Sequence, residues 1–343
     1  MTGRIFGLLF VVVLALSATC GGETSHLYKL GSESFCPSAN AFLFSVTVDS
    51  NEALPLPGLK RPISWLAVYE HDEKRVSRVG YPTHTPFFDW AWVPGQEAFV
   101  VAGSDRMVLY RRDASGGFSG TAISCPVDTL YLFCSWDPKG HWLAVTCNDV
   151  RIGKGGFKLG LYDLKEDRYV MTNTVMKPRR PVWQDDSRFY INTDRGVLTP
   201  DGGVVETRIS PRMPVPMLWR TVAHENGVSR FHGMIEGQPL TRKDKAIRLG
   251  DRTLAELDLA SDRRVAITET TIFVCASSTN MIAFDRNGRE VGKANPGRVI
   301  HLGPSGKDPD IVYGLTGSLL QYVCREEATV DVKEICDLGE FDY

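Results

Sequence analysis

Cysteine and histidine are the residues of this chain best suited to metal binding or redox chemistry, and their spacing decides whether either is expected. Seven cysteines follow the N-terminal segment: Cys36, Cys125, Cys134, Cys147, Cys275, Cys324 and Cys336. No two of them form a C-x-x-C motif, and no histidine lies at zinc-ligand spacing from any of them. Among the scattered histidines, His224 and His232 lie on adjoining predicted strands, but two ligands make a poor metal site. The sequence therefore predicts no metal and no cofactor. In an oxidising compartment some cysteines could form disulfides, and they fit equally well as small buried residues.

Two pairs of carboxylates, Asp185–Asp186 and Asp308/Asp310, are the candidates for acid–base chemistry. That chemistry needs two carboxyl groups held at a fixed separation in a rigid pocket. Both pairs stand in predicted turns, where aspartate accepts hydrogen bonds from the backbone, so a structural role is favoured. The stretch 151–158 contains glycines and lysines but lacks the P-loop spacing. No G-x-S-x-G nucleophile elbow occurs, and no catalytic residue is predicted.

Residues 1–20 have the layout of a secretory signal peptide. Arg4 is followed by fourteen uncharged, mostly apolar residues and then by small residues. This is the order of n-region, h-region and cleavage site. The apolar run is too short for a comfortable membrane span, which needs about 20 residues. We therefore expect an exported protein, periplasmic or extracellular, with a single domain over residues 26–340.

Cys20 gives the end of this segment a second interpretation. The stretch LSATCGG resembles the lipobox of bacterial lipoproteins, in which the cysteine becomes the acylated first residue of the mature chain. Ser17 and Thr19 depart from the lipobox pattern, which favours simple cleavage nearby. Both interpretations stay open at this point. A lipid on Cys20 would anchor the protein to a membrane, and no other membrane contact is expected.

A tryptophan-containing hairpin repeats along the chain and indicates the architecture. Trp92, Trp136 and Trp183 recur 44 and 47 residues apart, and each precedes a turn and a new apolar run. In SWDPKGHWLAV the turn DPKG separates two predicted strands, because proline and glycine set backbone angles that a continuous strand does not accept. Further four-strand sets are predicted, among them 181–209, and the later copies, from 216–259 on, have weaker patterns. No convincing helix is predicted.

The hairpin SWDPKGHWLAV resembles the W-S-P-D-G-x-x-I/L-A-F signature of TolB-type and related WD40-like β-propellers, and VWQDDSRFYIN and AWVPGQEAFVV resemble it with departures. The resemblance implies an all-β propeller with six or seven four-stranded blades. Such a blade is hydrophobic on both faces, so blades must stack and close into a ring. We expect Trp136 and Trp142 at contacts between blades, and residues 26–30 to add a strand to the last blade.

The propeller signature occurs in binding platforms, enzymes and accessory domains, so the fold alone does not identify the function. We expect a binding or scaffolding module that uses the long inserts 47–62 and 149–158, because function collects on loops held by a rigid frame. Its partner would be another protein or an envelope component. The net charge of −2 gives no bias toward nucleic acid.

Two alternatives to a binding module stay open. One is a glycan-processing hydrolase or lyase, which would need carboxylates, histidine or tyrosine from several blades to converge at the central channel. The other is a structural envelope component without a small ligand.

Overall fold

The structure of the protein is a computed structural model that describes much of the chain between residues 26 and 341. The described residues are 26–36, 40–48, 63–83, 87, 89–104, 106–123, 125, 129–149, 157–173, 178–183, 189–193, 196–200, 209–210, 213–214, 219–223, 229–258, 264–277, 279–295, 301–304, 311–316, 319–326 and 329–341. The predicted signal peptide 1–20, with Cys20, lies outside them. Within these ranges there is no α-helix, and no segment forms a helix that could cross a membrane.

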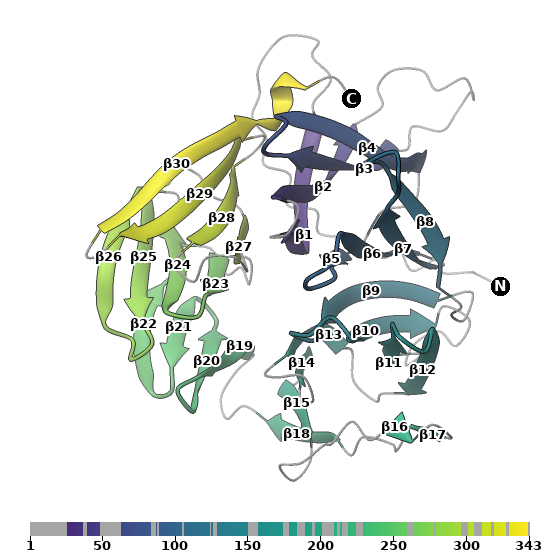
Figure 1. The fold of residues 1–343 in the computed structure, drawn as a ribbon. Coiled ribbons are helices and arrows are strands. Elements are labelled where there is room, and N and C mark those ends of the chain that lie inside the picture. Colours follow the sequence, from purple (N-terminus) through teal and green to yellow (C-terminus); the bar gives the residue numbers. More distant parts are fainter. Residues whose placement is uncertain are drawn as a thin grey trace, which may run out of the picture.

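The strands follow one another in antiparallel units of four that are arranged around a ring (Figure 1). Five units are separate four-stranded sheets, and one eight-stranded sheet has the order β4-β3-β2-β1-β5-β6-β7-β8. A single parallel bridge, between Glu33 of β1 and Ala91 of β5, joins the two halves of this larger sheet. The predicted all-β propeller of four-stranded blades is confirmed. Where six or seven blades were expected, five are separate four-stranded sheets, and two more four-stranded units share the eight-stranded sheet. We number the units blade 1 to blade 7.

The first three blades follow one another between residues 26 and 173. Blade 1 consists of β1 (His26–Cys36), β2 (Ala41–Val48), β3 (Ile63–Glu70) and β4 (Arg75–Thr83). Blade 2 consists of β5 (Asp89–Trp92), β6 (Ala98–Ala102), β7 (Met107–Arg112) and β8 (Phe118–Ala122). Blade 3 consists of β9 (Thr129–Trp136), β10 (Trp142–Asp149), β11 (Phe157–Asp163) and β12 (Arg168–Asn173).

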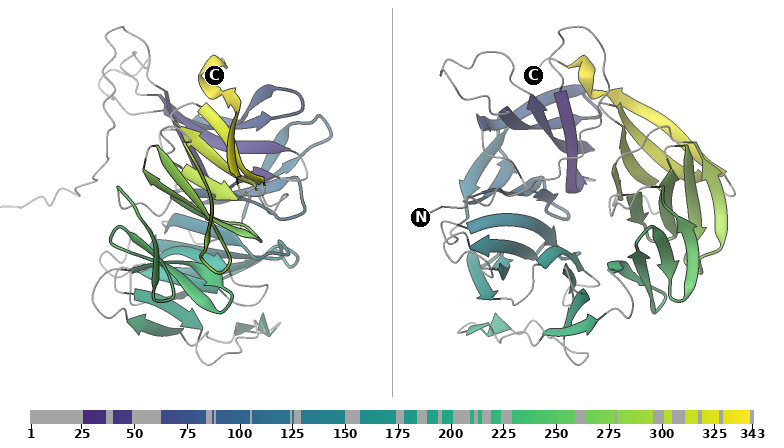
Figure 2. Two further views of the ribbon diagram at one scale, coloured as in Figure 1. Left: turned by 90° about the vertical axis from the view of Figure 1, so that its left-hand side faces the viewer. Right: turned by 180° about the vertical axis from the view of Figure 1, so that it is seen from behind.

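The remaining four blades complete the ring, which Figure 2 shows from behind. Blade 4 consists of β13 (Pro178–Trp183), β14 (Phe189–Thr193), β15 (Gly196–Pro200) and β18 (Trp219–Ala223), with a small hairpin of β16 (Ile209–Ser210) and β17 (Met213–Pro214) between its last two strands. Blade 5 consists of β19 (Ser229–Ile235), β20 (Gln238–Lys243), β21 (Ala246–Leu249) and β22 (Arg252–Glu256). Blade 6 consists of β23 (Val265–Ile267), β24 (Thr271–Ser277), β25 (Asn280–Asp285) and β26 (Glu290–Ala294). Blade 7 consists of β27 (His301–Pro304), β28 (Ile311–Thr316), β29 (Leu319–Glu326) and β30 (Thr329–Asp337), followed by the 3-10 segment η3 (Leu338–Glu340).

The boundary between blades 4 and 5 differs from the one that the sequence predicts. The sets 181–209 and 216–259 assign the Trp219 segment to the fifth set, but β18 pairs with β15 of blade 4, from Gly196↔Ala223 to Pro200↔Trp219. Blade 5 has four strands without that segment. Its second strand is β20, which has the polar sequence QPLTRK and pairs with β19. A strand with so few apolar residues has no hydrophobic alternation to identify it.

The repeated tryptophans connect the first strands of neighbouring blades. The indole N–H groups of Trp92, Trp136 and Trp183 each donate to a backbone carbonyl in the first strand of the preceding blade. The acceptors are Ser34, Ala91 and Ser135, at 2.8, 3.3 and 2.9 Å. The spacing of 44 and 47 residues in the sequence is therefore the spacing of equivalent hydrogen bonds between blades.

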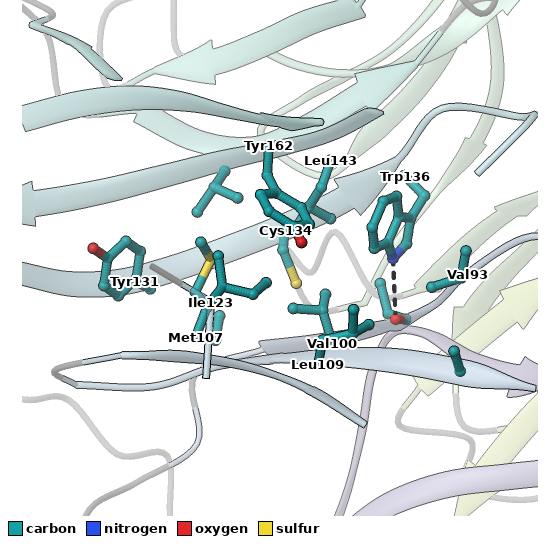
Figure 3. Close-up of a cluster of buried hydrophobic side chains, with 14 of the residues drawn as sticks. Val93, Val100, Met107, Leu109, Ile123, Tyr131, Cys134, Trp136, Leu143 and Tyr162 are labelled. Carbon is teal, nitrogen blue, oxygen red and sulfur yellow. Dashed lines mark hydrogen bonds between the residues drawn. The ribbon is translucent and has the colours of Figure 1, made fainter. Parts of the chain in front are cut away.

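Hydrophobic clusters between neighbouring blades form the core. Between blades 2 and 3, Met107, Leu109 and Leu143 are buried in one cluster with Trp136 (Figure 3). Trp136 lies at this contact, as predicted. Trp142 is only half-buried, and its ring contacts that of His141 in the same hairpin.

The ring closes between blades 7 and 1 without an exchanged strand. The prediction that residues 26–30 add a strand to the last blade is wrong, because they belong to β1 and pair with β2, and blade 7 takes its four strands from residues 301–337. Side chains make the closure: the Tyr28 hydroxyl donates to the Leu338 carbonyl at 3.4 Å, and the rings of Phe35 and Tyr313 lie 4.4 Å apart.

Candidate functional site

The two long inserts leave the same face of the ring, which we call the insert face. The insert 47–62 joins β2 to β3, and the insert 149–158 joins β10 to β11, so both connect the second and third strands of a blade. The parallel bridge between β1 and β5 shows that the first strands of blades 1 and 2 run in the same direction, and the repeated tryptophan hydrogen bonds extend this arrangement to blade 3. Residues 49–62 and 150–156 lie outside the described residues, so the site is built from the strand ends that carry them.

Two buried oxygen atoms lie on β10 just before the second insert. Thr146 is fully buried, and neither its Oγ1 nor the Oδ1 of Asn148 has a hydrogen-bond partner in the described part of the chain. Val145 and Cys147 of β10 pack toward blade 2. Because side chains alternate along a strand, Thr146 and Asn148 face the other way, toward blade 4, as Ala144 does. Buried polar groups are almost always hydrogen-bonded, so these two oxygen atoms have acceptor capacity that no described residue uses.

A cluster of phenols and thiols lies on the other side of blade 3. Tyr131 pairs with Cys147 across β9 and β10, and its ring lies 6.4 Å from that of Tyr169. Burial, followed by a hydrogen bond with Cys125, raises the pKa of Tyr131. Burial also raises the pKa of Tyr169 well above its ordinary value, with the Cys147 thiol beside it. Both phenols are therefore neutral at physiological pH, and the cluster can donate and accept hydrogen bonds but contains no general base.

A glycine makes room for this cluster. Gly160 is buried on β11 opposite Val145, and a Cβ atom at this position would collide with the hydroxyl of Tyr169. The two clusters on blade 3 were not predicted from the sequence. The one available signal is the polar residue types of VTCND before the insert, in a strand whose neighbours are apolar.

Most of the residues that the sequence singles out do not come together. Asp185–Asp186, Asp308/Asp310 and His224 lie outside the described residues, as does most of the stretch 151–158; His232 is half-buried on β19. The described cysteines carry thiols rather than disulfides: Cys36, Cys125, Cys134, Cys147, Cys275 and Cys336. In the hairpin of β29 and β30, Cys324 pairs with Asp331 and Cys336 with Leu320, so these two cysteines are not opposite each other.

The first strands of the blades lie toward the middle of the ring, where the hydrolase alternative would need its catalytic residues. Among their described side chains the only carboxylate is Asp89, which is buried and accepts the N–H of Cys134 at 3.2 Å. No group of three histidine, cysteine or acidic residues suited to a metal occurs within the described residues. Glycoside hydrolysis by the usual mechanism needs two carboxyl groups flanking the substrate, and the described side chains of these strands provide one.

The face opposite the insert face carries an ion-pair network that joins blades 1 and 2. Glu70, at the end of β3, is buried, and its carboxylate lies 2.6 Å from Arg75 and 2.7 Å from Arg112 of blade 2. Arg112 also pairs with Glu97 and stacks on the Phe118 ring at 4.8 Å. The network holds the turns of two blades together. It was missed in the sequence because its residues come from different repeats.

We expect this network to make the protein less stable in acid. Burial acts to raise the pKa of Glu70, but hydrogen bonds from Arg75 and Arg112 outweigh it and hold the pKa below its ordinary value of 4.5. A carboxyl group with a lowered folded-state pKa contributes stability that is complete above pH 4.5 and is lost as the pH falls through the folded-state value. In chemical unfolding at a series of pH values, E70Q should therefore lose part of the acid sensitivity.

The neighbouring Glu73 provides the matched control. It pairs with Arg75 at 2.8 Å, but its side chain is exposed. E73Q should keep the acid sensitivity of the wild type, because exposed ion pairs contribute little. Equal slopes of stability against pH for the wild type and E70Q would contradict the assignment.

Aspartates in the turns of this same face act as backbone caps. Asp137 accepts the N–H groups of His141 and Trp142, each at 2.6 Å, and Asp163 accepts that of Lys165 at 3.0 Å. Asp163 also contacts His141 Nε2 at 3.1 Å. These contacts show aspartate capping the backbone in two turns, whereas the same role predicted for Asp185–Asp186 and Asp308/Asp310 is not tested, because those residues lie outside the described ones.

Comparison with known proteins finds structures of the same fold but no match by sequence. No protein-family model matches the chain, and no curated protein sequence matches it. Among solved structures, Chaetomium thermophilum Raptor is similar over 88% of this chain and 28% of its own, with 13% identity and a TM-score of 0.56. U3-55K is similar over 74% of this chain and 82% of its own, with 10% identity and a TM-score of 0.52.

A bacterial protein is among the similar structures. PorZ of Porphyromonas gingivalis, described as an essential surface component of the type-IX secretion system, is similar over 91% of this chain and 39% of its own, with 12% identity and a TM-score of 0.51. The chain spans less than half the length of Raptor and of PorZ. At these identities the likeness shows the fold alone. The protein has an all-β propeller fold built from four-stranded blades.

Proposed function

We propose that the protein is an exported binding module that holds a protein partner or an envelope component on its insert face. The observation that carries this proposal is the placement of both long inserts on second-to-third strand connections. Loops of this kind are carried by a rigid frame, which fixes their position without limiting their sequence. The buried oxygen atoms of Thr146 and Asn148 lie directly before one of them and add hydrogen-bonding capacity there.

Export and the form of the N-terminus are the parts of this proposal that rest on the sequence. The apolar run after Arg4 supports cleavage near residue 20, and LSATCGG supports lipidation of Cys20 as the alternative. The hairpin signature supports TolB type within the propellers. Mass spectrometry of the protein purified from its own membranes decides between the two N-termini: a diacylated Cys20 supports a lipid anchor, and an unmodified N-terminus at another residue contradicts it.

Replacing residues 150–156 by a single glycine leaves Asp149-Gly as a two-residue turn between Asn148 and Phe157, and it should abolish binding of partners held on the insert face and leave the fold intact. A two-residue turn can join antiparallel strands, and β10 and β11 pair from Trp142↔Asp163 to Asn148↔Phe157 without the insert. The measurement is cross-linking in cell-envelope fractions followed by identification of the partners, with thermal unfolding as the check on folding.

The control replaces a turn on the opposite face. Residues 114–116, between β7 and β8, are exposed or half-exposed and can be changed to Gly-Asn-Gly while Asp113 keeps its place. This variant should keep every cross-linked partner. Partners that survive replacement of residues 150–156 but disappear with the control variant would contradict the insert face as the binding surface.

A further inference from the structure

The last strand of blade 2, β8, is an edge strand without the features that protect the other blades. Its sequence FSGTA contains no charge and no proline, and Ser119, Gly120, Thr121 and Ala122 are all exposed. Charged residues occur on the outer strand of each other blade: Arg75 and Arg78 on β4, Arg168 on β12, Arg220 on β18, Arg252 and Glu256 on β22, Glu290 and Lys293 on β26, and Lys333 and Glu334 on β30. Charges and prolines are how sheet edges avoid pairing with other chains.

The hydrogen bonds of β7 and β8 show which backbone groups of the edge point outward. Ile123 N–H donates to Met107 at 3.0 Å, and Asp113 N–H donates to Gly117 at 2.9 Å. Hydrogen-bonded pairs alternate along an antiparallel ladder, so Leu109↔Thr121 and Arg111↔Ser119 are also hydrogen-bonded pairs. The backbone N–H and C=O groups of the remaining β8 residues, Phe118, Gly120 and Ala122, therefore point away from β7.

The side chains beside this edge define what could pair with it. Arg111 is exposed and has no ion-pair partner among the described residues, whereas Arg112 pairs with Glu70 and Glu97. Side chains alternate along strands, so Arg111 shares one face of the sheet with Ser119 and Thr121. A strand added outside β8 would place one of its residues beside Ser119, within reach of the Arg111 guanidinium.

We propose that β8 binds an extended segment of a partner protein, with small or β-branched uncharged residues along the edge and an acidic residue that pairs with Arg111. Adding a strand to a sheet edge provides affinity through main-chain hydrogen bonds and specificity through alternate side chains. The proposal goes beyond the proposed function, because β8 is on the outer rim of the ring and does not involve the inserts.

The test selects nine-residue peptides from a displayed random library on the immobilised full chain. Selected peptides should contain alternating β-branched residues and an acidic residue.

A122P removes an outward N–H without removing a hydrogen bond to β7, and it should weaken binding of the best peptide by about tenfold or more, as measured by fluorescence anisotropy. R111Q should weaken the same peptide and T121V should not. The variant without residues 150–156 should bind it normally, which separates this proposal from the insert face.

Hydrogen exchange of the wild-type chain gives a test that does not depend on a variant that folds. Bound peptide should protect the amides of Phe118, Gly120 and Ala122, which point outward, more than those of Ser119 and Thr121, which already bond to β7. The proposal is overturned if no selected peptide protects residues 118–122, or if the selected peptides bind A122P and the wild type equally.

Discussion

W136A is expected to lower the free energy of unfolding by about 3–5 kcal/mol, the range for truncating a large aromatic residue in a core. Trp136 is 3% exposed and lies in the cluster between blades 2 and 3 (Figure 3). Its indole N–H also donates to Ala91, so truncation removes apolar contact and an inter-blade hydrogen bond together. Urea unfolding followed by circular dichroism measures the difference.

Trp142, six residues later in the same hairpin, is the matched control. It is half-buried against His141, so W142A should cost less than about 1.5 kcal/mol. W136F keeps most of the apolar contact and should lose about 1 kcal/mol for the hydrogen bond plus a smaller packing term. If W142A and W136A lowered the free energy of unfolding equally, the contact between blades would not explain the contribution of Trp136 to stability.

The same two tryptophans show how far the sequence predicts the fold. Both were expected at blade contacts, and the structure confirms that expectation for Trp136. The repeat of Trp92, Trp136 and Trp183 was informative because each has an equivalent hydrogen bond to make. Trp142 begins the next strand directly after a turn, is half-buried, and is not a member of the hydrophobic clusters on either side of blade 3 in the described part of the chain.

Blade 5 shows why the later repeats were harder to predict. Its first hairpin turns at Glu236 and Gly237, which both have positive φ, 46° and 76°. The turn therefore fits the two-residue hairpin type with both central residues left-handed. Glutamate is an uncommon residue in that position, and the strand after the turn contains Pro239 and few apolar residues. Neither the turn nor the strand has the usual sequence signal, so tertiary pairing decides the structure.

The candidate site was predictable as a face of the ring and not as a set of side chains. Insert lengths and strand order are local properties, and these indicated the insert face. The contact of Tyr131 with Tyr169 and that of Glu70 with Arg112 depend on register and on blade stacking. Such contacts join residues that are 38 and 42 positions apart, with no repeated motif to mark them.

L338A is the second variant with a large expected effect, and it tests how the ring closes. Leu338 is fully buried in η3, in the cluster that joins blade 7 to blade 1. Its truncation should lower the free energy of unfolding by about 2–5 kcal/mol. Because β1 stays in blade 1 and adds no strand to blade 7, no inter-blade ladder of hydrogen bonds compensates for lost side-chain contact here.

Glu340, two residues later in the same 3-10 segment, provides the control. It is exposed, and E340A should change the free energy of unfolding by no more than about 0.5 kcal/mol. Y28F removes the hydrogen bond from β1 to the Leu338 carbonyl and should cost about 1 kcal/mol. Both stability measurements use urea unfolding, and limited proteolysis adds a local readout: L338A should be cut in the last blade before the others. If L338A is as stable as E340A, closure does not depend on this cluster, and the contacts of Phe35 with Tyr313 must be sufficient to hold blades 7 and 1 together.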